Sequence, residues 1–172
     1  MSIQAEIKSH IEKKLFLLAS EFGGEETPRT IYYSIEVQQV VDGANSVGKN
    51  KNRFASAKAV MDAFIDLGEI TFGMNPHNKA FDARMARTDP IASGIVDFRV
   101  LDPKPGIRVF GCFSELDTFV ALTWRFREEM IDGEFDAEVA RCSQEWLRLF
   151  PNFRPLVGVN IHDYISQNQF AV

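Results

Sequence analysis

Hydrophobic and polar positions alternate most clearly between residues 94 and 127. Three runs rich in Val, Ile and Phe occupy this stretch, at residues 94–101, 107–113 and 118–127. β-Branched and aromatic side chains suit the pleated surface of a strand, and turn residues such as Pro103, Pro105 and Gly106 separate the first two runs. The pattern therefore predicts a three-stranded antiparallel meander.

The first of these strands has two chemically different faces, because successive side chains of a strand point to opposite sides. One face would hold Ile95, Asp97, Arg99 and Leu101, and the other Val96, Phe98 and Val100. One side of the predicted sheet is therefore apolar and the other carries charge.

Apolar residues at three- and four-residue spacings predict helices on both sides of the meander. The expected helices span residues 2–20, 53–67, 80–87 and 136–150. Ser2 and Asp136 are suitable capping residues for the first and the last helix. Gly23 and Gly24 are expected to end the first one.

Alternation over residues 30–41 predicts one more strand, turned by Asp42 and Gly43. We expect an α+β fold, with an antiparallel sheet made of this early strand plus the meander and with helices packed on it. Residues 25–154 would form a single domain, residues 1–24 an N-terminal helical extension and residues 155–172 a C-terminal tail. The partial alternation of residues 156–165 indicates an edge strand or a contact with the edge of a neighbouring molecule.

Composition is that of an ordinary globular protein, with 172 residues, 45% hydrophobic and 25% charged. Only two cysteines occur, Cys112 and Cys142, so a disulfide framework is not expected and a reducing, cytoplasmic setting is. The longest apolar run near the start, residues 15–19, is too short to span a bilayer. A net charge of −5 means that any binding to nucleic acid needs a local basic patch.

Arginines recur along the predicted sheet and just before it. They are Arg84, Arg87, Arg99, Arg108, Arg125 and Arg127. A single arginine on an exposed face is usually a solvated or salt-bridged residue, so only their convergence on one groove would indicate a site.

Three short motifs stand on the predicted strands: Phe-Arg-Val at 98–100, Gly-Ile-Arg-Val-Phe at 106–110 and Trp-Arg-Phe-Arg at 124–127. Together with the order helix, strand, helices, meander and helix, they resemble the RelE/HigB superfamily of bacterial toxin components, which includes relatives of phage origin. The resemblance covers residues 31–150. It implies a RelE-like domain with helices on one face of an antiparallel sheet, and cleavage of messenger RNA, often on the ribosome, without a metal or other cofactor.

The resemblance also implies roles for the arginines. Arg99, Arg108 and Arg127 would be catalytic, because a planar guanidinium donates to two phosphate oxygens at once and stabilises an in-line transition state. The expected RNA-binding residues are Arg84, Arg87 and Arg125. The expected partners are an antitoxin protein, messenger RNA and the ribosome, with no membrane and with a possible homodimer contact through the N-terminal helix and the tail.

Other interpretations stay open. Glu128 and Glu129 stand where many relatives carry lysines, and these carboxylates would repel RNA phosphates. The chain could therefore be an inactive relative that assembles or binds a partner, which predicts scattered arginines. It could also be a small-molecule-binding α+β domain with a cleft lined by some of its fifteen phenylalanines.

Two further motifs give weaker indications of function. Gly48-Lys49 follows a predicted strand, but Asn50 replaces the Ser or Thr that a phosphate-binding loop needs for magnesium. His77 could act as a base, yet no carboxylate partner or metal-ligand spacing accompanies it in the sequence, which favours an exposed loop histidine.

Overall fold

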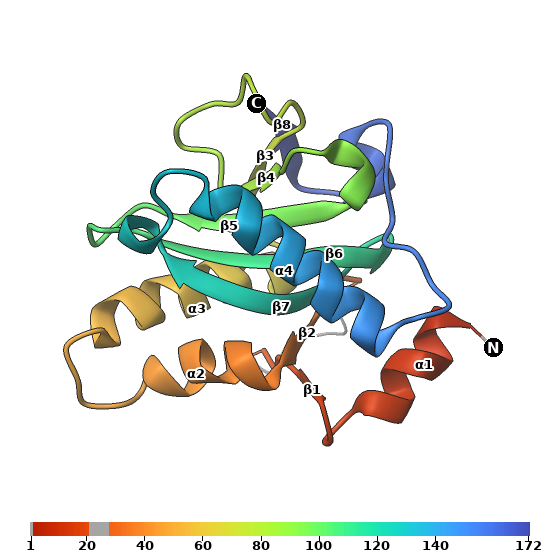
Figure 1. Ribbon diagram of the computed structural model, residues 1–172, viewed down its shortest axis with the longest axis horizontal. Helices are drawn as coiled ribbons and strands as arrows, with labels where there is room; N and C mark the ends of the chain where they lie inside the picture. Colours follow the sequence, from red (N-terminus) through yellow and green to blue (C-terminus); the bar gives the residue numbers. More distant parts are fainter. Residues whose placement is uncertain (1, 21–27) are drawn as a thin grey trace.

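The computed structural model describes residues 2–20 and 28–172 and contains a single mixed sheet with helices on both of its faces (Figure 1). The described residues form four α-helices: α1 (Ile3–His10), α2 (Ile35–Gly43), α3 (Lys51–Ile65) and α4 (Glu134–Leu149). They form eight strands: β1 (Leu15–Leu17), β2 (Thr30–Ser34), β3 (Ile70–Gly73), β4 (Met85–Arg87), β5 (Ile95–Val100), β6 (Ile107–Glu115), β7 (Thr118–Phe126) and β8 (Gln169–Ala171). Short 3-10 helices are η1 (Ile91–Ser93), η2 (Arg127–Glu129) and η3 (Ile161–Asp163).

The expected fold was wrong in the size and the pairing of its sheet. The strand order is β1-β2-β7-β6-β5-β4-β3-β8, so the meander β5-β6-β7 forms the centre rather than most of the sheet. β2 pairs with β7 in parallel, and β3 pairs in parallel with both β4 and β8, whereas the expected sheet was antiparallel throughout. The added strands β1, β3, β4 and β8 have three or four residues each, too few for an alternating pattern to reveal them.

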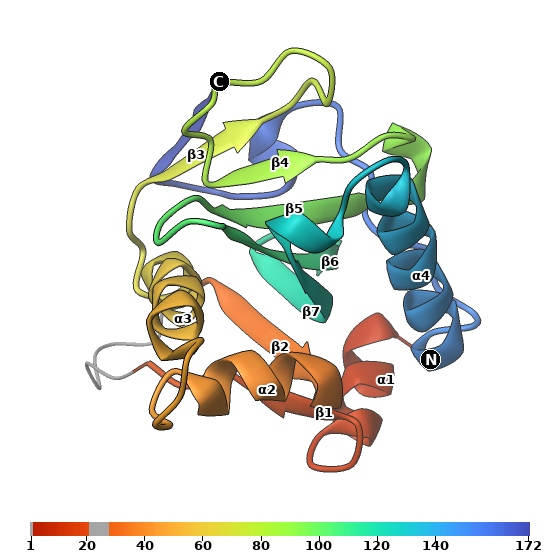
Figure 2. The ribbon, with the colours of Figure 1, turned by 60° about the vertical axis from the view of Figure 1, so that its left-hand side comes forward.

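Two hydrophobic cores lie on opposite faces of the sheet (Figure 2). α2 and α3 cover one face, where Val37 and Phe64 pack with Phe98. α1 and α4 cover the other, where Ile7 and Trp146 belong to the second core. This arrangement corrects the expectation of helices on one face only.

The meander matches its sequence pattern. Val96, Phe98 and Val100 all lie in the core beneath α2 and α3, as alternation requires. Ile95 lies in the opposite core, and Asp97 beside it is only 1% exposed. The charged face of the sheet is therefore partly buried rather than facing water.

Residues 30–41 form a strand and a helix, not the single strand that was expected. Ser34 ends β2 and caps α2, because its hydroxyl accepts a hydrogen bond from the Val37 amide at 3.2 Å. Val37 and Val40 are then buried at helical spacing. β-Branched residues fit either element, so the cap decides between them.

Other boundaries also differ from expectation. α1 ends at His10, and Glu12 adopts a positive φ of 65°, which turns the chain into β1. Residues 80–87 contain β4 rather than a helix. Gly23 and Gly24 lie outside the described residues. α1 packs on its own sheet through Ile7, and the homodimer contact stays a prediction.

The C-terminal segment returns to the sheet. Leu156 and Tyr164 pack in the core beneath α2 and α3, and the Asp117 amide donates to the Tyr164 carbonyl at 2.9 Å. The edge strand formed here is β8, beyond the residues whose alternation indicated one. No helix among residues 2–20 and 28–172 is long and apolar enough to cross a membrane.

Candidate functional site

The register of the central strands places arginines side by side. Arg99 on β5 is opposite Arg108 on β6, and Arg108 is opposite Arg125 on β7. The Arg99 amide also donates to the Arg84 carbonyl at 2.7 Å, next to the start of β4. Like charges directly opposite each other destabilise a sheet. A row of arginines across neighbouring strands therefore needs nearby carboxylates or an anionic ligand to offset its charge.

Three of the arginines line one open pocket of about 610 Å³ at the end of the meander. Its lining residues are Phe81, Arg99, Val100, Leu101, Lys104, Pro105, Gly106, Arg108 and Arg127. We call it the arginine pocket. It contains Arg99, Arg108 and Arg127, which the sequence indicated as catalytic, and it lies between the β3–β4 loop, the β5–β6 turn and η2.

Arg108 is the most buried of the three, with 8% exposure. Its Nη1 donates to Asp97 Oδ2 at 3.1 Å, an ion pair between β6 and β5. Burial lowers the pKa of Arg108, Asp97 opposes that shift, and the charges of Arg99 and Arg127 add to it. Burial raises the pKa of Asp97, and Arg108, Lys79 and Arg99 oppose this. Arg108 pairs directly with Asp97, and the charges of Lys79 and Arg99 also act on this carboxylate.

Arg99 holds the loop in front of the pocket. Its Nη1 donates to the carbonyls of Ala80 at 3.0 Å and Ala83 at 3.3 Å. Its Nε is buried without a hydrogen-bond partner in the described part of the chain. Within residues 2–20 and 28–172, Arg99 therefore bonds to neutral carbonyls only, and no carboxylate there pairs with its positive charge.

Arg127 is exposed and lies on the other side of the β5–β6 turn. Its amide donates to the Gly106 carbonyl at 2.7 Å, which ties η2 to this turn. Its Nη1 donates to the Met130 carbonyl at 3.2 Å, again a neutral partner. The described residues that line the pocket thus carry three guanidinium groups, the ammonium group of the exposed Lys104 and no carboxylate, while Asp97 pairs with Arg108 beside it.

Lys79 adds a further positive charge close enough to act on Asp97, Arg99 and Arg108. Burial lowers the pKa of its amine, Asp97 opposes that shift, and Arg99 and Arg108 add to it. Its stem packs close to Gly73, where an added Cβ would stand 2.7 Å from the Lys79 Cβ. Lys79 belongs to the β3–β4 loop, whose turn-rich sequence gave no indication of a role.

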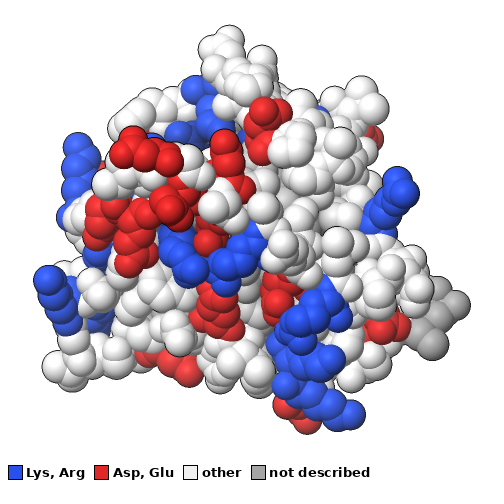
Figure 3. Space-filling view, in the orientation of Figure 1, with Lys and Arg blue, Asp and Glu red and all other residues white. Residues whose placement is uncertain are grey.

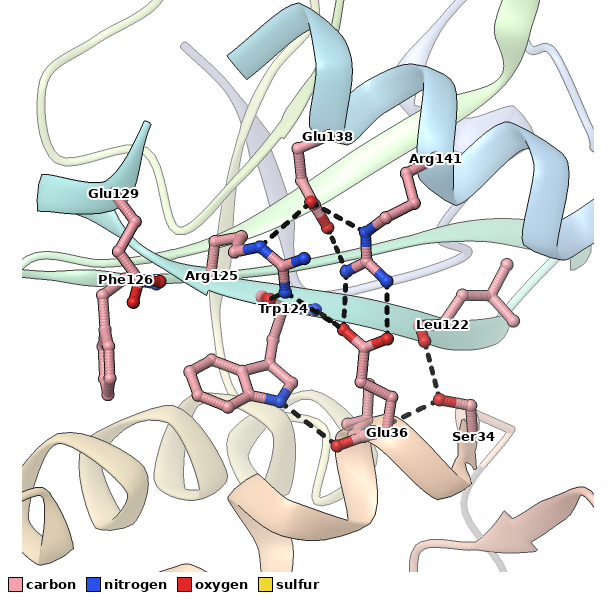
Figure 4. A network of polar contacts seen from close by, with 10 residues as sticks. Ser34, Glu36, Leu122, Trp124, Arg125, Phe126, Glu129, Glu138 and Arg141 are labelled. Atoms are coloured by element: carbon pink, nitrogen blue, oxygen red, sulfur yellow. Dashed lines mark hydrogen bonds and ion pairs between the residues drawn. The ribbon is translucent and has the colours of Figure 1, made fainter. Parts of the chain in front are cut away.

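Arg125 does not line the arginine pocket. Its Nε lies 3.3 Å from Glu138 Oε2 and its Nη1 lies 3.5 Å from Glu36 Oε1 (Figure 4). Arg141 on α4 binds the same two carboxylates, with two contacts of 2.6 Å to Glu36. We call Glu36, Arg125, Glu138 and Arg141 the ion-pair network.

The ion-pair network lies where β2 ends and leaves part of β7 without a neighbouring strand. There the Ser34 hydroxyl donates to the Leu122 carbonyl at 2.6 Å, and the Trp124 amide donates to Glu36 Oε1 at 3.2 Å. The Trp124 indole also donates to the Glu36 carbonyl at 3.2 Å. These contacts satisfy the free edge of β7 and join α2, β7 and α4 (Figure 4).

The remaining expected RNA-binding residues, Arg84 and Arg87, do not line the arginine pocket. Arg84 is exposed, and alternation from the buried Met85 turns it to the sheet face of Arg99. Arg87 donates to the carbonyls of Met74 and Gly158, so it fastens the C-terminal segment to the β3–β4 loop. Glu128 is paired with Arg53 at 2.7 Å, which neutralises one of the carboxylates next to the pocket.

The surface charge is mixed. Basic and acidic side chains are interleaved over the face seen in Figure 3, with no single large basic area there. Among the described residues no group of three or more His, Cys, Asp and Glu is placed to hold a metal ion. The arginine pocket therefore has a local excess of cations on a chain of net charge −5.

The other candidate residues from the sequence do not line the arginine pocket. His77 is exposed, 3.7 Å from the Asp89 carboxylate. Gly48 and Lys49 are exposed in the turn between α2 and α3. Cys112 and Cys142 are free thiols buried together between β6 and α4.

Sequence reasoning missed the apolar part of the arginine pocket. Phe81 and Leu101 line it, and Pro105 closes the turn beside them. The Pro103–Gly106 turn signal marked the end of the hairpin, but nothing local to it indicates that the β3–β4 loop folds over it. No family model, no curated protein and no solved structure matches this chain.

Proposed function

We propose that the protein binds RNA through the arginine pocket and acts as a RelE/HigB-like toxin that cleaves messenger RNA. The observation that supports this is the convergence of Arg99, Arg108 and Arg127 on one open pocket, where Asp97 pairs with Arg108. A chain of net charge −5 has no general attraction for RNA, so binding would depend on such a local excess of cations.

The pocket has donors that suit a phosphodiester. A phosphodiester presents two anionic oxygens, and a guanidinium donates to both at once. Arg108 is held in place by Asp97, which leaves its Nε and Nη2 without a partner among the described residues. A side chain fixed in this way loses little further entropy when it binds an anion.

The same groups fit the electrostatic part of RNA cleavage. A ribose 2′-hydroxyl gives up its proton to solvent while its oxygen attacks the adjacent phosphorus, the bond to the 5′-oxygen breaks, that oxygen takes a proton from solvent, and a 2′,3′-cyclic phosphate and a 5′-hydroxyl result. Negative charge gathers on the equatorial oxygens in the transition state, where preorganised arginines stabilise it most. None of the described residues that line the pocket is an Asp, Glu, His or Tyr, so the geometry supports binding more fully than proton transfer.

Fluorescence anisotropy with a short labelled single-stranded RNA tests the binding. Arg127→Ala removes an exposed side chain that donates only to a backbone carbonyl, so the fold should survive. Removal of one charged donor predicts about 10- to 100-fold weaker binding. For single strands the slope of log affinity against log salt should also fall by about 0.7 for each phosphate that the variant no longer binds.

Arg154→Ala is the matched control, because Arg154 is exposed and has no hydrogen bond or ion pair with the part of the chain that the structure describes. It should leave both affinity and salt slope unchanged. Equal binding by the wild type and Arg127→Ala would remove the arginine pocket as the site.

Cleavage is tested separately by expression in bacteria. If the chain cleaves messenger RNA, the wild type slows growth and Arg108→Ala and Arg127→Ala relieve it, since loss of a transition-state donor costs about 10²–10³ in rate. A wild type that binds RNA yet leaves growth and messenger RNA intact would show a binding protein without nuclease activity.

A further inference from the structure

The arginine pocket has an apolar side as well as a cationic side. Phe81, Val100, Leu101 and Pro105 form part of its lining, facing the same space as the three arginines. Phe81 is 76% exposed, against 53% for Phe170, the other phenylalanine with a largely exposed side chain in the described residues. A ring so exposed contributes little to the core, and it presents an aromatic face at the pocket.

Phe81 is held in position by a residue of the site itself. Arg99 Nη1 donates to the carbonyls of Ala80 and Ala83, on either side of Phe81 in the chain. The turn that presents the ring is therefore fixed to β5. No ring in the described part of the chain stacks on Phe81, whereas many of the other phenylalanines make ring contacts. The faces of Phe81 are available to a ligand.

We infer that Phe81 stacks on an unpaired base whose neighbouring phosphate binds the arginines, so that the substrate is single-stranded RNA with one base turned out of its stack. This inference rests on the proposed function and specifies its substrate. Planar bases stack on aromatic side chains regardless of base identity, and proteins that read single strands combine such platforms with cationic grooves.

The size of the pocket agrees with one nucleotide unit. Its volume of about 610 Å³ lies within the range of about 300–1,000 Å³ typical of small-molecule sites. A paired base inside a duplex is stacked on both faces and cannot offer one to Phe81 without leaving the helix. Duplex RNA should therefore reach the arginines only through its backbone, without the stacking contribution.

Two oligonucleotides of equal length separate the base from the phosphate: a labelled single-stranded oligouridylate and its abasic counterpart, which keeps sugars and phosphates only. By anisotropy, Phe81→Ala should bind the oligouridylate about 5- to 150-fold more weakly than the wild type. Binding of the abasic strand should not change. Phe81→Trp should restore the oligouridylate affinity, since it restores an aromatic face.

Leu17→Ala is the control, because Leu17 is also an exposed apolar residue, 53% exposed, on β1 at the far end of the strand order. Unchanged oligouridylate binding by Phe81→Ala, together with weaker binding by Arg127→Ala, would overturn the stacking inference and leave RNA binding intact. No RNA binding by the wild type, or an unchanged affinity in Arg127→Ala, would overturn the proposed function and this inference with it. Equal wild-type affinity for the oligouridylate and the abasic strand would also refute stacking.

Discussion

The ion-pair network should stabilise the protein more than a surface salt bridge does, and a double-mutant cycle can measure by how much. Arg141 donates to both oxygens of Glu36 at 2.6 Å, with 34% and 31% of the two side chains exposed. Isolated exposed pairs contribute about 0.2–1 kcal/mol, whereas breaking a buried pair costs about 3–5 kcal/mol. Bidentate geometry at partial burial places the Glu36–Arg141 coupling between these limits, at about 1–2 kcal/mol.

The single change Arg141→Met should cost more than the coupling alone. Glu138 is 4% exposed and accepts two hydrogen bonds from Arg141, at 2.6 and 2.9 Å. After the change only Arg125, at 3.3 Å, remains as its cationic partner. Loss of hydrogen-bond donors to a buried carboxylate lowers the free energy of unfolding by about 1–3 kcal/mol. Arg141→Met should therefore destabilise the fold by about 2–4 kcal/mol in total.

Urea denaturation of the wild type, Glu36→Gln, Arg141→Met and the double variant gives the coupling free energy. The control cycle uses Glu145 and Arg148, a pair on the same helix with 27% and 55% side-chain exposure. That pair should couple by only about 0.3–0.5 kcal/mol. If both cycles gave the same small value at low salt, the claim that the ion-pair network holds α4 and α2 to the edge of β7 would be refuted.

Two more outcomes follow from buried titratable groups. Burial raises the pKa of Asp97 above its ordinary value of 3.8, so between pH 3.8 and the raised pKa the native state holds a proton that the unfolded state releases. The stability of the wild type relative to Asp97→Asn should therefore fall as pH rises through this range. Denaturation of both variants across acidic pH checks this, and a relative stability that rises with pH there would contradict it. Burial also raises the pKa of the Cys112 thiol, with Cys142 adding to the shift. A thiol reagent should therefore leave both cysteines unmodified in the native protein and react with both in urea, while rapid labelling of the folded protein would show that α4 does not cover them.

The local sequence predicted those strands and helices that are long enough to show a regular hydrophobic pattern. The alternation of residues 94–127 predicted β5, β6 and β7, and the spacing of apolar residues predicted α3 and α4 closely. It also placed Arg99 and Arg108 on adjoining strands, and the structure puts them opposite each other. These inferences succeed because side-chain periodicity and a short turn depend only on residues near one another in the chain.

Tertiary structure decided what depends on distant partners. β1, β3, β4 and β8 are too short to carry a period, and they exist because a neighbouring strand offers hydrogen bonds to them. Arg125 follows the same alternation as the other arginines, yet Glu36 and Glu138 from two helices pair with it, whereas Arg127 lines the pocket. Phe81 lies in a turn-rich stretch and lines the pocket because Arg99 binds the carbonyls on either side of it. A pattern of residues can propose a charged face, but long-range ion pairs and loop contacts determine which of its charges a ligand can reach.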